Sequence, residues 1–108
     1  MTREIKNEMD KLIQLLEAEE DKYSEYMFDL EKDDFGCYHI LYPNNVIREC
    51  SVICNPMSYG HEEGLLEIMG LLTKEESEDD DVVGWLTAED VFNRIVKDWK
   101  KNKKLYQS

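Results

Sequence analysis

The sequence predicts an α+β fold, in which a small antiparallel sheet of about three strands carries about three helices packed on it. Two patterns predict this class. Apolar residues recur at helical spacing near both ends of the chain, whereas residues 35–54 are rich in aromatic and β-branched side chains interrupted by turn residues. The 108 residues are the usual size of one domain, and 42% of them are hydrophobic, enough for a core. We therefore expect residues 1–108 to form a single domain.

The first predicted element is an amphipathic helix with Thr2 as its N-cap. Apolar residues recur there at steps of three, four and seven: Ile5, Met9, Leu12, Ile13 and Leu16. Residues 23–32 fit either a continuation of this helix or a strand, because Tyr26, Phe28 and Leu30 also fall at every second position. We favour the strand, since the polar residues 19–22 interrupt the helical stripe.

Residues 35–54 predict a β-hairpin at the centre of a three-stranded meander. Two β-rich runs, residues 35–42 and 46–54, flank the turn residues 43–45, and Asp33-Asp34 would form the preceding turn. Alternate residues of the second run share a face that we expect to be buried: Val46, Arg48, Cys50, Val52 and Cys54.

The second half of the chain predicts two further helices. The first would begin at Ser58 or His61, and its apolar residues have helical spacing: Leu65, Ile68, Met69 and Leu72. An exposed acidic loop near residues 75–81 and a short apolar piece, residues 82–86, should follow. Thr87 is the expected N-cap of the last helix, with Asp90 three residues later. Its apolar face comprises Val91, Phe92, Ile95, Val96 and Trp99, and its end, residues 97–104, is rich in lysine.

The cysteines and histidines are the candidate metal ligands or catalytic groups: Cys37, His39, Cys50, Cys54 and His61. Their spacing fits no standard zinc motif, and four residues of a strand span about 13 Å, too far for two thiolates to share one ion. The glycines at 60 and 64 enclose two glutamates, which would repel the phosphates of a nucleotide. We therefore expect no metal, no cofactor and no disulfide.

Acidic residues dominate the charge, with 25 Asp and Glu against 13 Lys and Arg, a net charge of −12. They are concentrated in residues 17–34 and 75–81. Such a surface repels phosphates but can occupy the basic groove of a protein that handles nucleic acid. We therefore predict a protein partner and no direct nucleic-acid binding; the simpler alternative is that the charge serves solubility. The predicted partner-binding residues are Glu17, Glu19, Glu20, Asp21, Glu75, Glu76, Glu78, Asp79, Asp80 and Asp81.

The location of the protein is predicted from what its sequence lacks. The first residues do not have the basic-then-apolar layout of a signal peptide, and no apolar run approaches the roughly 18 residues that cross a bilayer. We expect a cytoplasmic protein without a membrane partner. The sequence leaves the oligomeric state open, because Trp85, Trp99 and Tyr106 fit a core as well as a self-interface.

Several segments carry a resemblance that covers about residues 35–96. They are residues 35–39 (FGCYH), 48–55 (RECSVICN), 58–60 (SYG), 64–72 (GLLEIMGLL) and 83–91 (VGWLTAEDV). These segments resemble short, uncharacterised proteins of bacteriophages, prophages and other mobile elements. The resemblance implies a context and no catalytic residues. Small acidic proteins of such elements include inhibitors of host defence nucleases, the anti-CRISPR proteins among them.

Three hypotheses for the function follow. The first is a non-catalytic binding protein from a mobile element that inhibits or modulates a nucleic-acid-handling partner through the two acidic stretches. The second is an immunity or antitoxin-type protein that covers the active site of one cognate toxin. The third is a small thiol-dependent enzyme that uses Cys50 or Cys54 with His39 or His61 as base, which requires an exposed thiol of low pKa. We favour the first hypothesis and expect the protein not to be an enzyme.

Overall fold

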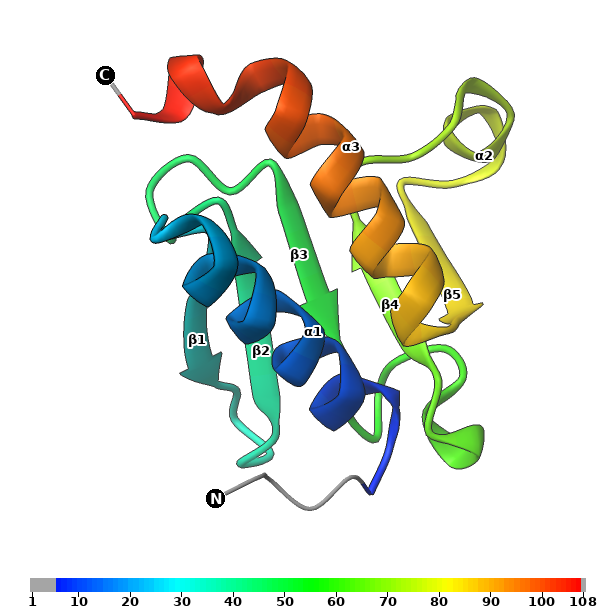
Figure 1. Cartoon of the computed structure of the whole chain (residues 1–108). Helices are drawn as coiled ribbons and strands as arrows, with labels where there is room; N and C mark the ends of the chain where they lie inside the picture. Colours follow the sequence, from blue (N-terminus) through cyan, green and yellow to red (C-terminus); the bar gives the residue numbers. More distant parts are fainter. Residues whose placement is uncertain (1–5, 108) are drawn as a thin grey trace.

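The computed structural model describes residues 6–107 and contains one five-stranded antiparallel sheet and three α-helices (Figure 1). The elements in chain order are α1 (Glu8–Tyr23), β1 (Asp29–Lys32), β2 (Tyr38–Tyr42), β3 (Cys50–Ile53), the 3-10 helix η1 (His61–Glu63), β4 (Leu66–Met69), α2 (Lys74–Asp79), β5 (Val82–Leu86) and α3 (Ala88–Tyr106). The strands lie in the order β1-β2-β3-β4-β5, so each strand pairs with its neighbours in sequence. The predicted α+β class is confirmed, with five strands instead of about three.

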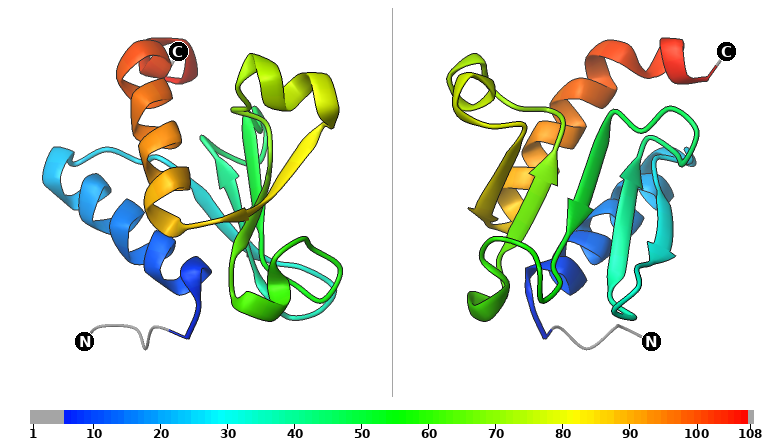
Figure 2. Two further views of the ribbon diagram at one scale, coloured as in Figure 1. Left: turned by 90° about the vertical axis from the view of Figure 1, so that its right-hand side faces the viewer. Right: turned by 180° about the vertical axis from the view of Figure 1, so that it is seen from behind.

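Helices α1 and α3 lie side by side on one face of the sheet, and neither covers the opposite face (Figure 2). We call that opposite face the open face. The core lies between the helices and the sheet. The strands contribute Ile40, Val52 and Ile68, which lie opposite one another on β2, β3 and β4. The helices contribute buried aliphatic and aromatic side chains: Leu12, Ile13, Leu16, Val91, Ile95 and Trp99.

Helix α1 ends later than predicted, and the strand after it is shorter. The helix begins after Asn7, whose side chain accepts a hydrogen bond from the Asp10 N–H; the predicted cap, Thr2, lies outside the described residues. The polar residues 19–22 do not interrupt it, because three of the four are Glu or Lys, which favour a helix. The helix ends at Ser24, whose φ of 53° is left-handed. The predicted strand over 23–32 is therefore wrong except for Asp29–Lys32.

The predicted hairpin is confirmed for β2 and β3, but its second strand starts later than expected. The Asn44 side chain accepts hydrogen bonds from the N–H groups of Val46 and Ile47, which folds this segment into a turn. Val46 is 86% exposed, so the prediction that it shares a buried face is wrong, and Arg48 is exposed as well. The remaining members of that face are buried as predicted: Cys50, Val52 and Cys54.

The helix predicted around Leu65 to Leu72 is wrong, because this segment forms β4. Leu66 and Ile68 are fully buried and alternate with Glu67 and Met69, as in a strand. Gly70 ends the strand with a φ of 96°, and a Cβ there would lie 2.0 Å from the carbonyl oxygen of Glu49. Neither Ser58 nor His61 caps a helix here, since η1 follows Gly60 without a side-chain cap.

The predicted acidic loop contains the short helix α2. Thr73 and Glu76 form a capping box, in which each side chain accepts a hydrogen bond from the other residue's backbone N–H. The prediction for the last helix is confirmed. The Thr87 side chain accepts from the Asp90 N–H, and Val91, Ile95 and Trp99 are buried.

Candidate functional site

The two acidic stretches do not form one surface. The C-terminal half of α1 and the helix α2 lie on opposite sides of α3, and they stay apart when the molecule is turned by 90° (Figures 1 and 2). The ten predicted partner-binding residues therefore belong to two separate regions, which must be considered one at a time.

The α1 region offers little free charge. The Glu20 carboxylate accepts a hydrogen bond of 2.7 Å from the Met27 N–H and so fixes the connection to β1, while its burial raises the pKa of this carboxyl. Glu17 and Glu19 are half-buried. Only Asp21 of the four predicted α1 residues is exposed. This half of the predicted site therefore presents one exposed carboxylate, Asp21, whereas Glu20 serves the fold.

The acidic segment, which we define as residues 75–81, is different because one of its carboxylates anchors the rest. Arg94 of α3 donates to both carboxylate oxygens of Glu76, at 2.7 and 2.8 Å, and also to Asp90 and to the carbonyl oxygen of Leu71. The guanidinium lowers the pKa of Glu76 to about 2. The other carboxylates of the segment are exposed: Glu75, Glu78, Asp79, Asp80 and Asp81.

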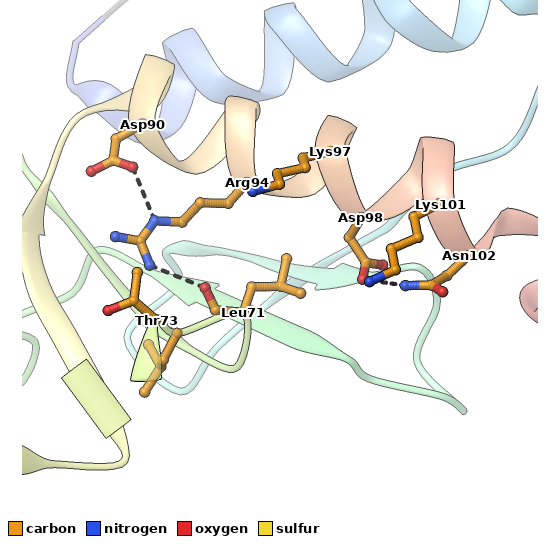
Figure 3. Close-up of a pocket in the computed structure, with 9 residues that line it drawn as sticks. Leu71, Thr73, Asp90, Arg94, Lys97, Asp98, Lys101 and Asn102 are labelled. Atoms are coloured by element: carbon orange, nitrogen blue, oxygen red, sulfur yellow. Dashed lines mark hydrogen bonds and ion pairs between the residues drawn. The ribbon is translucent and has the colours of Figure 1, made fainter. Parts of the chain in front are cut away.

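A cavity of about 490 Å³ lies between α3 and the connection from β4 to α2 (Figure 3). Its polar side chains are mostly engaged within the protein. Arg94 has the partners described above, and Asp98 accepts hydrogen bonds from Asn102 and from the hydroxyls of Tyr42 and Tyr106. Lys97 and Lys101 are exposed at its rim. This cavity is therefore lined by the ion pairs and hydrogen bonds that join α3 to the rest of the fold.

The cysteines do not form the site that a thiol enzyme requires. Cys50 is fully buried, and burial raises the pKa of its thiol to about 12; burial also raises the pKa of Cys54. His39 contacts Ser51 at 2.5 Å, on the open face, whereas Cys50 faces the helices. All three cysteines are free thiols. Within residues 6–107, no three His, Cys, Asp or Glu side chains are grouped as a metal site.

A pocket that the sequence analysis missed lies beside the edge strand β5. Its centre is a stacked pair, Tyr59 and Trp85, with ring centroids 5.3 Å apart and ring planes within 16°. The two side chains are 49% and 57% exposed. The pocket has a volume of about 240 Å³, and its lining comprises Pro56, Ser58, Tyr59, Gly60, His61, Glu62, Glu63 and Trp85.

The backbone around Trp85 explains how an indole ring comes to face solvent. The register shifts between β4 and β5, so that β5 has one more residue than β4 across this step. Trp85 takes up the extra length with a φ of 57°, a conformation that usually requires glycine at a bulge. Leu86 therefore returns to the core while Trp85 faces outward. Gly84, next to Trp85, is the part of this arrangement that is visible in the sequence. The structure explains why a glycine stands there, because a Cβ at position 84 would lie 2.2 Å from the Cβ of Tyr59.

Comparisons with family models, with curated proteins and with solved structures find no match to this chain. Among the described helices, none combines the length and the apolar composition needed to cross a bilayer. The resemblance to proteins of mobile elements stays a prediction. The acidic segment and the Tyr59–Trp85 pocket are the two surfaces on which a functional proposal can be based.

Proposed function

We propose that the protein is a non-catalytic binding protein that docks on a basic surface of a protein partner and inhibits or modulates a partner that handles nucleic acid. The observation that carries this proposal is the acidic segment, in which three exposed carboxylates lie on the anchored helix α2 and two more follow it directly. Such a surface is complementary to a groove lined by lysine and arginine. The resemblance to mobile-element proteins supports the same class of partner.

The acidic segment carries an electrostatic cost that a basic partner would relieve. Glu75 and Glu78 are three residues apart and Glu75 and Asp79 four, and like charges at these spacings destabilise a helix. A helix of six residues is also too short to persist alone. The capping box and the Glu76–Arg94 pair hold it in place despite this repulsion. Positive charges on a partner would therefore bind a surface that is already ordered.

A nucleic-acid-handling protein is the favoured partner because its groove is built to bind a row of negative charges. Closely spaced carboxylates present a field similar to that of a phosphate backbone. The same similarity predicts competition, since the protein and a nucleic acid would occupy one groove. It also predicts that added salt slows association, because the attraction acts over a distance that salt shortens.

The test is capture of binding proteins from a bacterial lysate with two variants of equal charge. One variant carries Glu75→Gln, Glu78→Gln and Asp79→Asn; its control carries Asp21→Asn, Asp34→Asn and Glu49→Gln. Both change three exposed carboxylates and leave the Glu76–Arg94 pair intact. We expect the wild type and the control to retain a nucleic-acid enzyme that excess duplex DNA releases, and the α2 variant to lose it. Equal retention by both variants, or a captured protein indifferent to DNA, would contradict the proposal.

A further inference from the structure

We propose that the Tyr59–Trp85 pocket binds the guanidinium group of an arginine side chain on a basic protein partner. This inference deepens the proposed function and rests on it, because the arginine belongs to the same class of partner. The pocket is nevertheless separate from the acidic segment, since its residues belong to the connection before β4 and to β5. The two surfaces can therefore be tested independently.

The aromatic pair supplies the flat surface of the pocket. The rings stack nearly parallel with their centroids 5.3 Å apart, and about half of each residue is exposed and can contact a ligand. A guanidinium is planar and weakly hydrated, so it stacks on tryptophan and tyrosine faces and is attracted by their π-electrons. Trp is the strongest partner for such a contact.

Carboxylates supply the complementary charge. Glu62 and Glu63 line the pocket and are exposed, and within residues 6–107 neither forms a salt bridge or a hydrogen bond through its carboxylate. His61 also lines the pocket, and its Nδ1 is the one buried side-chain nitrogen or oxygen of the described residues without a hydrogen-bond partner. A guanidinium presents five N–H donors in a rigid fork, which a carboxylate accepts in pairs.

Contacts within the protein hold the pocket in shape. The Tyr59 N–H donates to a carboxylate oxygen of Glu67 at 3.0 Å, and Gly84 allows the Tyr59 side chain to lie directly against β5. Gly60 approaches the backbone of Trp85 so closely that a Cβ there would lie 3.0 Å from its nitrogen. Asn55 and Ser58 bond each other and close the preceding turn. A ligand would therefore meet a formed site and lose less free energy to ordering.

The chemistry of the pocket selects arginine over other occupants. The two glutamates repel anions and would be costly to bury against an apolar segment. Lysine carries a compact, strongly hydrated charge that cannot lie flat on an indole ring. Arginine alone among protein side chains combines a planar face for the rings with a forked set of donors for the carboxylates.

The two tryptophans make the test direct, because Trp85 is exposed and Trp99 is buried. In an NMR titration with the peptide acetyl-Gly-Gly-Arg-Gly-Gly-amide, the indole N–H signal of Trp85 should shift to saturation while that of Trp99 stays in place. The corresponding lysine peptide should bind about five- to tenfold more weakly, and a peptide with the neutral isostere citrulline should not saturate. Equal shifts with the citrulline peptide, or no shift of Trp85 with the arginine peptide, would overturn the inference.

Matched variants separate this pocket from the acidic segment. Glu62→Gln with Glu63→Gln should weaken binding of the arginine peptide at least about fivefold, since it removes the charge-assisted bonds and leaves the rings. Glu75→Gln with Glu78→Gln has the same charge change and should leave peptide binding unaltered. If the two pairs of substitutions weaken peptide binding equally, the pocket is not the arginine site, whereas the proposal for the acidic segment is unaffected. Loss of partner capture only with the Glu62 and Glu63 variant would instead refute the acidic segment as the docking site.

Discussion

Arg94 joins three parts of the molecule with one side chain. It bonds Glu76 of α2, Asp90 on its own helix and the carbonyl oxygen of Leu71 after β4. The guanidinium of Arg94 and the carboxylate of Glu76 are largely shielded, with 17% and 25% of their side chains exposed. A shielded, bidentate pair contributes more than an ordinary surface ion pair. Glu76 thus differs from its acidic neighbours, although nothing in the run of like residues distinguishes it except Thr73 three positions earlier.

The Glu76–Arg94 pair predicts a pH-dependent stability. Because the pKa of Glu76 is lowered from 4.5 to about 2 on folding, its contribution is complete above about pH 5 and is lost as the pH falls toward 2. Glu76→Gln should therefore lower the free energy of unfolding by about 2 kcal/mol at pH 7 and by less at each step down to pH 2.5. Urea unfolding measures both values. Glu78→Gln is the control, and an identical loss for the two variants at pH 7 would disprove the anchoring role.

The thiols predict a graded reactivity. Cys37 is partly exposed, whereas Cys50 and Cys54 are buried and have raised pKa values. Iodoacetamide at pH 8 should therefore modify Cys37 first and the other two only after denaturation, because the thiolate is the reactive form. Peptide mass spectrometry identifies the modified residue. Rapid modification of native Cys50 or Cys54 would contradict this order and revive the thiol-enzyme hypothesis.

At the scale of elements, α3 and the β2–β3 hairpin could be predicted because each pairs a clear periodicity with a specific end signal. Thr87 with Asp90 marks the start of α3, and the turn residues 43–45 separate the two strands. The strand β4 could not be predicted, because the apolar residues around it have helical spacing by coincidence: Leu65, Ile68, Met69 and Leu72. Four-residue strands are too short for periodicity to decide. The neighbouring strands decide instead, by pairing with Leu66 to Met69.

Of the two candidate sites, one could be predicted from the sequence and the other could not. The exposed carboxylates of residues 75–81 were predictable from charge, since a run of acids stays in water. The Tyr59–Trp85 pocket could not be predicted, because its two rings are 26 positions apart in the sequence and meet only through the bulge in β5. Gly60 and Gly84 were visible in the sequence, but the close contact that each allows depends on the fold.

Gly84 predicts the consequence of disturbing the pocket. Gly84→Ala would place a methyl group 2.2 Å from the Cβ of Tyr59, so that either the connection before β4 or the edge strand must move. We expect a loss of about 1–3 kcal/mol in the free energy of unfolding and a weaker near-ultraviolet circular dichroism signal from the stacked rings. Gly36→Ala is the control, since a Cβ there meets nothing and only its φ of 76° opposes the change. Unchanged stability and dichroism for Gly84→Ala would show that the contact is not restrictive.

The whole chain has a net charge of −12, and the mutual repulsion of its acidic side chains opposes the compact folded state. Raising sodium chloride from 20 to 300 mM should therefore increase the free energy of unfolding by about 0.5–1 kcal/mol, because salt screens the repulsion. The Glu75, Glu78 and Asp79 variant should be more stable than wild type at low salt and should gain less from added salt. Urea unfolding at the two salt concentrations measures this difference. A wild type destabilised by salt would show that attractive pairs outweigh the repulsion.

The meander has a consequence for the order in which the protein folds. Each strand pairs with its sequence neighbour, so the sheet can form one strand pair at a time through connections that are local in sequence. Contacts between the N-terminal region and α3 are instead non-local. Glu8 of α1 accepts a hydrogen bond from the Ala88 N–H, and Glu25, just after α1, pairs with Lys103. Leu12, Ile13 and Leu16 of α1 belong to the same core cluster as Val91, Ile95 and Trp99 of α3. We therefore expect the docking of α1 on α3 to be a late, non-local step of folding, which during synthesis must wait until the ribosome has completed α3.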